Sequence, residues 1–345
     1  MNRKAIWLSV VLLTVFLLAA CGQTETEEKQ ESTCVQDRYV IAMPLVHPYL
    51  TIMNQGAEQA AQDLGVELMW LSSADFNVNK QVELAESSLS IPCVKGLSVM
   101  AADPGSVETV LQTANNMGIT AHMMSGCGVD PAEWDRRADN NISSLCYSTD
   151  FNAAGALIAE KVATMLGGKG NVVISTQQPD AGQKERELAF SDYITANYPD
   201  IKIIGVLNDC DSPSGTVACA ENAISTYPEM NAYVATGQYQ AVGPVSVFPA
   251  AGRNDIIVTA YDDSPEVLEG IQKGVITFSV AQQPFGQGYM MVYLNYLMNE
   301  GKMPTQKFID TGVTFIDAGN VDSYMDTMKS NWEILKQQID TEFFN

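Results

Sequence analysis

The 345-residue sequence has only two histidines, His47 and His122, and it lacks the short motifs of the common hydrolase and nucleotide sites. It contains no GxSxG nucleophile elbow, no GxxxxGK[ST] phosphate loop and no HExxH zinc motif. No Cys and His spacing suggests a zinc or redox centre. The sequence therefore predicts neither an enzyme nor a protein that holds a metal ion or another cofactor, and catalysis stays only a minor alternative.

Basic residues are also scarce, because 19 Lys and Arg stand against 41 Asp and Glu, a formal net charge of −22. Such a charge repels the phosphate backbone of nucleic acids and the surfaces of anionic lipids. Hydrophobic residues make up 46% of the chain, which supplies enough material for a large core. The composition therefore argues against a nucleic-acid partner and against an acidic disordered chain.

The N-terminus has the pattern of a secretory signal peptide, predicted to cover residues 1–20. Its apolar stretch, Ala5–Leu18, is shorter than the about 20 residues that a membrane-spanning helix needs. The stretch leads into LAAC, ending at Cys21, which resembles the lipobox of bacterial lipoproteins. This resemblance implies cleavage before Cys21, lipid on that residue, and a flexible tether over residues 21–34. An ordinary signal peptide with a chance cysteine is the alternative.

Six further cysteines, an even number, suggest disulfides in a protein outside the cytosol. Fifteen pairings are formally possible. Local pairs are the simplest arrangement, because one pair flanks a short turn and another flanks a polar segment. The candidate pairs are Cys210 with Cys219, Cys127 with Cys146, and, to complete the set, Cys34 with Cys93. Buried free thiols are the alternative.

From Arg38 onward, short β-rich runs alternate with stretches of helical periodicity. A polar, loop-like segment at residues 126–141 interrupts this alternation, and a second series of similar length follows it. Repeated strand and helix units predict a parallel α/β sheet, so two series predict two doubly wound, Rossmann-like lobes. The predicted lobes are residues 35–148 plus 283–312 and residues 149–282 plus 313–345, with crossings near 147–150, 281–284 and 311–316.

Polar side chains and an aromatic residue follow several predicted strands, at the edge where open α/β sheets bind ligands. They include Tyr49, Asp262 and Gln282. A sugar needs such a set, because its ring face stacks on an aromatic side chain and each buried hydroxyl needs a hydrogen-bond partner. Alone, Asp262 also fits a helix N-cap and Tyr49 a core or surface tyrosine.

Six fragments between Arg38 and about Ile316 together resemble bacterial periplasmic sugar-binding proteins of the ribose-binding type, which serve ABC importers. The fragments are HPYLTIMNQGAEQAAQDLGVEL, STDFNAAGALIAEKV, KERELAFSDYITANYPD, YPEMNAYVATGQYQAVG, TAYDDSPEVLEGIQKG and VAQQPFGQG. The resemblance implies the type I periplasmic binding fold, in which two lobes close by a hinge over a ligand in the cleft between them.

Carried over by position, the resemblance implies seven ligand-binding residues: His47, Tyr49, Ser125, Lys184, Gln238, Asp262 and Gln282. Asp262 and Gln282 match the usual residues of the family. Ser125, Lys184 and Gln238 depart from its pattern, so a hydroxyl arrangement other than that of ribose is expected. Lys184 otherwise fits a solvated helix face. Trp134 fits either a second stacking ring over the cleft or a plain surface loop.

These observations predict a monomeric, lipid-anchored solute-binding component of an ABC importer, on the periplasmic or cell-surface side of a membrane. The expected ligand is a monosaccharide or a similar small polyhydroxylated molecule, which the protein delivers to a membrane permease. A sensory receptor on the same scaffold and a binder of nucleosides or other small polar solutes remain open. A transcription regulator of related fold is excluded by the signal peptide and by the lack of a helix-turn-helix segment ahead of Arg38.

Overall fold

The computed structural model describes residues 34–345 except residues 47, 75–76, 102, 125–130, 144, 178–180 and 211. Residues 36–345 form one unit, which is described below. The predicted signal peptide and the predicted lipid site at Cys21 lie outside the described residues. Among the described residues, no helix combines the length and apolar character that crossing a membrane requires.

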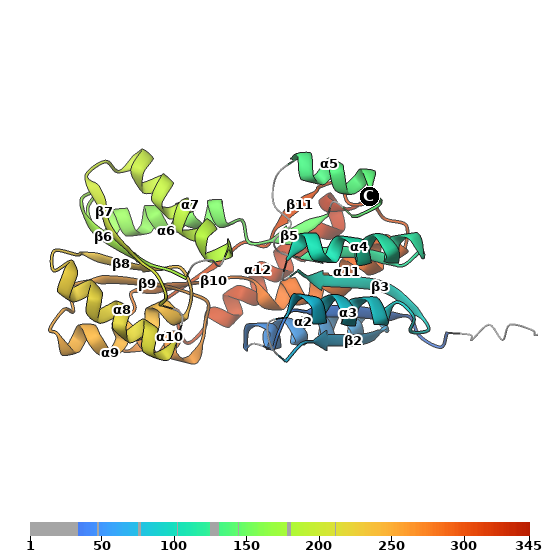
Figure 1. Ribbon diagram of the computed structural model, residues 1–345, viewed down its shortest axis with the longest axis horizontal. Coiled ribbons are helices and arrows are strands. Elements are labelled where there is room, and N and C mark those ends of the chain that lie inside the picture. The colour runs from blue at the N-terminus through green and yellow to red at the C-terminus, as the bar shows by residue number, and fades with distance from the viewer. Residues whose placement is uncertain are drawn as a thin grey trace, which may run out of the picture. The chain divides into compact units, whose positions relative to one another are not determined.

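The first sheet consists of four parallel strands in the order β2-β1-β3-β4, of which Figure 1 labels β2 and β3. These strands are β1 (Arg38–Met43), β2 (Glu67–Ser72), β3 (Val94–Met100) and β4 (Thr120–Met124). A short parallel pair, β5 (Cys146–Ser148) and β11 (Phe308–Asp310), lies next to it, with β5 in contact with β4. The helices of this part are α2 (Pro48–Leu64), α3 (Val78–Ser88), α4 (Pro104–Asn116), α5 (Pro131–Asp139) and α11 (Pro284–Asn299).

The second sheet has six strands in the order β12-β10-β9-β8-β6-β7. They are β6 (Gly170–Ser175), β7 (Ile201–Leu207), β8 (Ala232–Ala235), β9 (Ile257–Tyr261), β10 (Phe278–Ala281) and β12 (Thr314–Asp317). All neighbours are parallel except β12, which runs antiparallel to β10. The helices of this part are α6 (Phe151–Met165), α7 (Ala181–Asn197), α8 (Pro213–Thr226), η1 (Tyr239–Ala241), α9 (Val242–Ala250) and α10 (Pro265–Gln272). The predicted α/β class with two parallel sheets is confirmed.

The chain passes between the two sheets three times. Residues 149–150 join β5 to α6, residues 282–283 join β10 to α11, and residues 311–313 join β11 to β12. These crossings lie within the ranges that the sequence predicts. We propose that each predicted lobe, residues 35–148 plus 283–312 and residues 149–282 plus 313–345, moves as one body.

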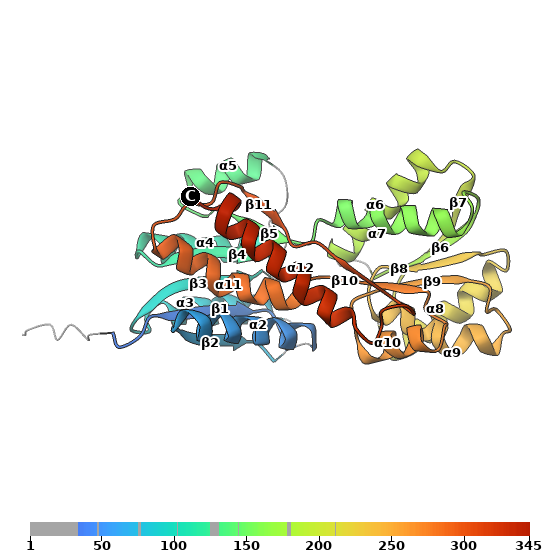
Figure 2. The same cartoon turned by 180° about the vertical axis from the view of Figure 1, so that it is seen from behind.

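The last helix, α12 (Tyr324–Gln338), packs against the cores of both sheets. Tyr324 and Met328 lie in a buried cluster with the strands and helices of the second sheet. Trp332 and Leu335 lie in a buried cluster with β1, α2 and α11. Figure 2 shows this helix in red, running from the α10 side towards β11 and the C-terminus. The packing therefore divides α12 between two cores, although the predicted boundaries place residues 313–345 in one lobe.

Helices α2 and α11 cross with their backbones in close contact, and glycines at the crossing make this possible. A Cβ atom added at Gly288 would lie 1.8 Å from the carbonyl oxygen of Met53. One added at Gly56 would lie 1.9 Å from the carbonyl oxygen of Phe285. The crossing therefore fixes the start of α2 relative to α11 with little freedom.

The prediction of a loop at residues 126–141 is wrong for residues 131–139, which form α5. Pro131 begins the helix, a position that proline favours. Arg136 Nη1 donates to Glu108 Oε2 at 2.8 Å, and Arg137 Nε donates to Glu108 Oε1 at 3.0 Å. These ion pairs join α5 to α4, and the high polar content of the segment is what made it resemble a loop. Trp134 therefore lies in a helix rather than in a loop.

Candidate functional site

Two of the predicted residues meet at the carboxyl edge of the second sheet. Asp262 follows β9 and Gln282 follows the neighbouring strand β10. Gln282 Nε2 donates a hydrogen bond of 3.0 Å to Asp262 Oδ1. Asp262 has φ +61°, a conformation that few residues other than glycine adopt, and Ser279 Oγ donates to its carbonyl oxygen at 2.6 Å. The surrounding contacts therefore hold the carboxylate in one place, as strained functional positions require.

The helix N-cap interpretation of Asp262 is wrong, because Ser264 caps α10. The side chain of Ser264 accepts a hydrogen bond of 3.4 Å from the amide of Val267. Asp263 bonds elsewhere, since the hydroxyl of Tyr324 donates to its Oδ2 at 3.0 Å. Burial raises the pKa of Asp263, while the hydrogen bond from Tyr324 lowers it and the charge of Asp262 raises it further. This leaves Asp262 free of any capping role.

Arg186, on α7, lies between two aromatic rings beside Asp262. Its guanidinium carbon is 4.4 Å from the ring centroid of Tyr261 and 4.5 Å from that of Phe151. Its Nη1 donates to the carbonyl oxygen of Thr236 at 2.9 Å. Stacking and this hydrogen bond fix the plane of the guanidinium group.

Two buried polar atoms of this stack have no hydrogen-bond partner among the described residues: Arg186 Nε and the hydroxyl oxygen of Tyr261. Burial raises the pKa of Tyr261 to about 12, so its hydroxyl stays protonated. Unpaired buried polar atoms cost free energy, so a ligand that supplies partners to these two atoms would gain affinity from them.

Tyr49, at the start of α2, brings the first sheet into the same site. Its hydroxyl donates a short hydrogen bond to Gln287 Oε1. Burial raises the pKa of this hydroxyl well above its usual range; the negative charge of Asp262 raises it further, and the positive charge of Arg186 opposes the rise. Tyr49, from the part of the chain around the first sheet, therefore lies within the electrostatic influence of Asp262 and Arg186.

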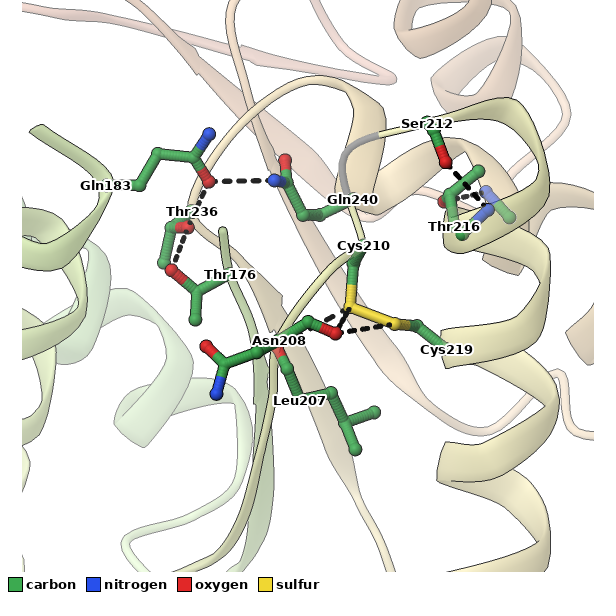
Figure 3. Close-up of a disulfide and its surroundings, with 12 residues drawn as sticks. Thr176, Gln183, Leu207, Asn208, Cys210, Ser212, Thr216, Cys219, Thr236 and Gln240 are labelled. Carbon is green, nitrogen blue, oxygen red and sulfur yellow. Dashed lines mark hydrogen bonds between the residues drawn. A yellow bond between two sulfur atoms is a disulfide. The ribbon is translucent and has the colours of Figure 1, made fainter. Parts of the chain in front are cut away.

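A buried network of polar side chains lies near the carboxyl ends of β6 and β8 (Figure 3). Gln183 Oε1 accepts hydrogen bonds from Thr236 Oγ1 at 2.9 Å and from Gln240 Nε2 at 2.7 Å. Thr236 Oγ1 also lies 3.0 Å from Thr176 Oγ1. Because Gln183 and Arg186 lie about one turn apart on α7, this network helps to fix the helix that presents Arg186.

A disulfide joins Cys210, after β7, to Cys219 of α8, close to this network (Figure 3). This pair confirms the prediction from spacing. Cys34, Cys93 and Cys146 are also disulfide-bonded. Cys127 lies outside the described residues, and the pairing of these cysteines stays as predicted.

The other predicted ligand residues are less informative. Gln238 is partly buried and precedes the short helix η1. Lys184 lies on α7, where its Nζ is 2.8 Å from Glu187 Oε1, and its ligand role stays a prediction. His47 and Ser125 lie outside the described residues. Within the described part of the chain, no group of three or more His, Cys, Asp and Glu side chains is placed to hold a metal ion.

Sequence reasoning missed Arg186, Tyr261 and Phe151 as parts of the site. In the family fragment KERELAFSDYITANYPD the resemblance implies that Glu185 and Arg186 are preserved, but it assigns the ligand role to Lys184 alone. The aromatic rings come from α6 and β9, so only the folded chain brings them to the guanidinium group.

Comparison with known proteins agrees with this architecture. Residues 39–303 match the sequence model of the periplasmic binding protein domain. The chain belongs to the periplasmic binding protein family. This periplasmic binding protein is 26% identical over 242 residues to the D-apiose import binding protein of Actinobacillus succinogenes, over 69% of this chain and 73% of that protein. It is 24% identical over 291 residues to the ribose import binding protein of Bacillus subtilis, over 82% of this chain and 88% of that protein.

Solved structures agree as well. A solute-binding protein of an ABC transporter from Burkholderia graminis, in complex with D-arabinose, is 26% identical, with a TM-score of 0.72 over 84% of this chain and 97% of that one. A sugar-binding protein from Bacillus halodurans, 22% identical, has the same fold, with a TM-score of 0.74 over 84% of this chain and all of that one. The predicted family and its type I fold are confirmed, and this periplasmic binding protein belongs to a family of binding proteins rather than enzymes.

Proposed function

We propose that this periplasmic binding protein is the lipid-anchored solute-binding component of an ABC importer and binds a monosaccharide or a similar polyhydroxylated molecule. The observation that carries the proposal is the hydrogen-bonded pair of Asp262 and Gln282 beside the stacked guanidinium group of Arg186. The relatives support it, because their names specify D-apiose, ribose and xylitol, and one solved relative holds D-arabinose.

The chemistry of the site favours an uncharged ligand. Asp262 offers carboxylate oxygens to ligand hydroxyls, and Gln282 and Arg186 offer N–H donors. The ring of Tyr49 supplies an apolar face for the C–H groups of a sugar. An anionic ligand would meet one guanidinium group against the two carboxyl groups of Asp262 and Asp263, so a neutral polyol or sugar is the better electrostatic match.

In the proposed mechanism no bond is made or broken. A ligand that contacts Tyr49 from the first sheet and Asp262 from the second stabilises the closed arrangement, because only that arrangement makes both sets of contacts. Bending at the three crossings between the sheets would allow the closure. The closed, loaded form is then the one that the proposed permease partner recognises.

Replacing Asp262 with Asn is expected to weaken sugar binding by more than tenfold, because the ligand loses a charged acceptor. Asn tolerates the positive φ at this position better than Ala would, so the free protein should keep its melting temperature. Isothermal calorimetry measures the effect, after a thermal-shift screen of D-ribose, D-arabinose, D-apiose, xylitol, nucleosides and amino acids. A ligand at about 100 times its dissociation constant adds about 2.7 kcal/mol of stability.

Gln282→Leu should behave in the same way, whereas the control Glu83→Ala should change nothing, because Glu83 is an exposed helix residue that pairs only with Lys80 among the contacts described. Unchanged affinity of both site variants would remove this pair from the ligand site. A thermal shift with amino acids alone would contradict the proposed ligand class.

Cys21→Ser is expected to release the protein from membranes, because it removes the site of the proposed lipid. Buried acyl chains contribute about 0.8 kcal/mol per methylene, so their loss abolishes anchoring. Membrane fractionation and labelling with a palmitate analogue measure the change, with Thr24→Ser in the predicted tether as the control. Persistent membrane attachment of the Cys21→Ser protein would count against the anchor.

A further inference from the structure

Gln287 links the candidate ligand residue Tyr49 to the segments that connect the two sheets. Its side chain is fully buried on α11. Its Oε1 accepts the hydrogen bond from the Tyr49 hydroxyl, and its Nε2 donates to Thr311 Oγ1 at 2.9 Å. Thr311 lies in the crossing at residues 311–313. One amide thus bridges the start of α2 and a crossing segment.

Gln287 and its partner Thr311 each make one backbone hydrogen bond at or next to the other two crossings. The amide of Gln287 donates to the carbonyl oxygen of Gln283 at 2.8 Å, and Gln283 belongs to the crossing at residues 282–283. The amide of Thr311 donates to the carbonyl oxygen of Ser148 at 3.0 Å, directly before the crossing at residues 149–150. Through Thr311, the hydrogen bonds of Gln287 therefore link residues at or next to all three connections.

The bonds of Gln287 are expected to persist. A buried amide that loses a partner costs the desolvation free energy of the unpaired group. The adjacent Gly288 packs against the backbone carbonyl of Met53, so α2 and α11 are in direct backbone contact next to Gln287. A displacement of the crossing segments during closure would therefore be transmitted from Thr311 through Gln287 to Tyr49.

We propose that Gln287 is a positioning residue that holds Tyr49 in its ligand-binding orientation and couples that orientation to the crossing segments. The inference rests on the proposed function, since it assumes that Tyr49 contacts the ligand. Gln287 does not itself touch the ligand. It acts through the hydroxyl of Tyr49, so removing either member should have the same consequence.

A double-mutant cycle tests this coupling. Gln287→Met keeps the side-chain length and removes both side-chain hydrogen bonds, and Tyr49→Phe removes only the hydroxyl. Each single variant is expected to weaken binding of D-ribose, D-arabinose or D-apiose by about tenfold. The double variant should be no weaker than either single one. Effects that multiply in the double variant would overturn the inference.

A control variant on the same helix separates positioning from stability. Asn295 is buried on α11, and its Nδ2 donates to Ser98 Oγ at 2.8 Å. Asn295→Leu should lower the melting temperature and leave the affinity unchanged. An equal loss of affinity in this variant would show that any damage to α11 has the effect. If Gln287→Met does not fold, Thr311→Val replaces it, because it removes the hydrogen bond between Gln287 and Thr311. This variant should also weaken sugar binding by about tenfold.

Hydrogen exchange of the ligand-free protein tests the inference independently of the proposed function, because the measurement needs no sugar. Gln287→Met should speed amide exchange within residues 49–52 and 311–314, while Asn295→Leu should not. If the wild-type protein binds none of the three sugars, the proposed ligand class fails, and this exchange result alone decides whether Gln287 positions Tyr49. Unchanged exchange in both segments would overturn the positioning role.

Discussion

Gly288→Ala is expected to lower the free energy of unfolding by about 3 kcal/mol. The new methyl carbon would lie 1.8 Å from the carbonyl oxygen and 2.5 Å from the carbonyl carbon of Met53. These are backbone atoms of α2 and no rotamer change relieves the clash, so the two helices must separate. In a free helix the same substitution stabilises by about 0.5–1 kcal/mol, so the sign of the change shows which effect is larger.

The matched control is Gly105→Ala on α4. Gly105 is exposed, and an added Cβ would have its nearest neighbour at 3.6 Å, an ordinary contact distance. This variant should gain about 0.5–1 kcal/mol. Urea unfolding of both variants and the wild type measures the difference. Equal behaviour of the two variants would mean that α2 and α11 do not touch as described.

Acidification is expected to destabilise the protein through His122, a buried residue of β4. Its Nε2 lies 3.3 Å from Ser98 Oγ, and its ring contacts Tyr147 edge to face, with centroids 5.4 Å apart. Its Nδ1 has no hydrogen-bond partner within the described part of the chain. Burial lowers the pKa of His122 from 6.5 to about 3, because the core offers the charged imidazolium no counter-ion.

The direction of the effect follows from the two pKa values. Between pH 6.5 and about 3 the unfolded chain binds a proton at this site and the folded protein does not. Stability from this residue is therefore complete above pH 6.5 and is lost as the pH falls, by up to about 1.4 kcal/mol for each pH unit. At pH 4.5 the loss should reach about 3 kcal/mol.

His122→Phe removes this titration, so its stability should fall less steeply between pH 6.5 and pH 4.5 than that of the wild type. Urea unfolding across this range measures the slope. Carboxyl groups such as Asp263 titrate in both proteins, so the difference between the slopes isolates His122. His47→Gln is the control, because His47 is the only other histidine of the sequence. Parallel slopes of wild type and His122→Phe would contradict the buried, neutral imidazole.

The sequence was sufficient to predict the two parallel sheets and the proximity of Asp262 and Gln282. Asp262 and Gln282 could be predicted because parallel neighbours end at one edge, so residues far apart in the chain meet there. Arg186 could not be predicted in its role, because Phe151 and Tyr261 reach it only through the packing of α6 against α7 and the sheet. Gln287 gave no signal either, since its partner Tyr49 lies 238 positions away.

Helix α5 is a second feature that the sequence pattern did not predict. Most of its nine residues are charged or small, and Arg136 and Arg137 pair with Glu108 on α4. Periodicity reports which face of a helix enters a core. A short helix of mostly polar residues gives a weak signal of this kind, so its sequence is typical of a loop.

The last helix, α12, couples the stability of one sheet to that of the other. Because Tyr324 and Trp332 are buried in different cores, release of α12 exposes apolar surface on both halves of the protein at once. Each half thereby loses stability when the other melts, so the chain gains cooperativity that its two-sheet architecture alone would not give it.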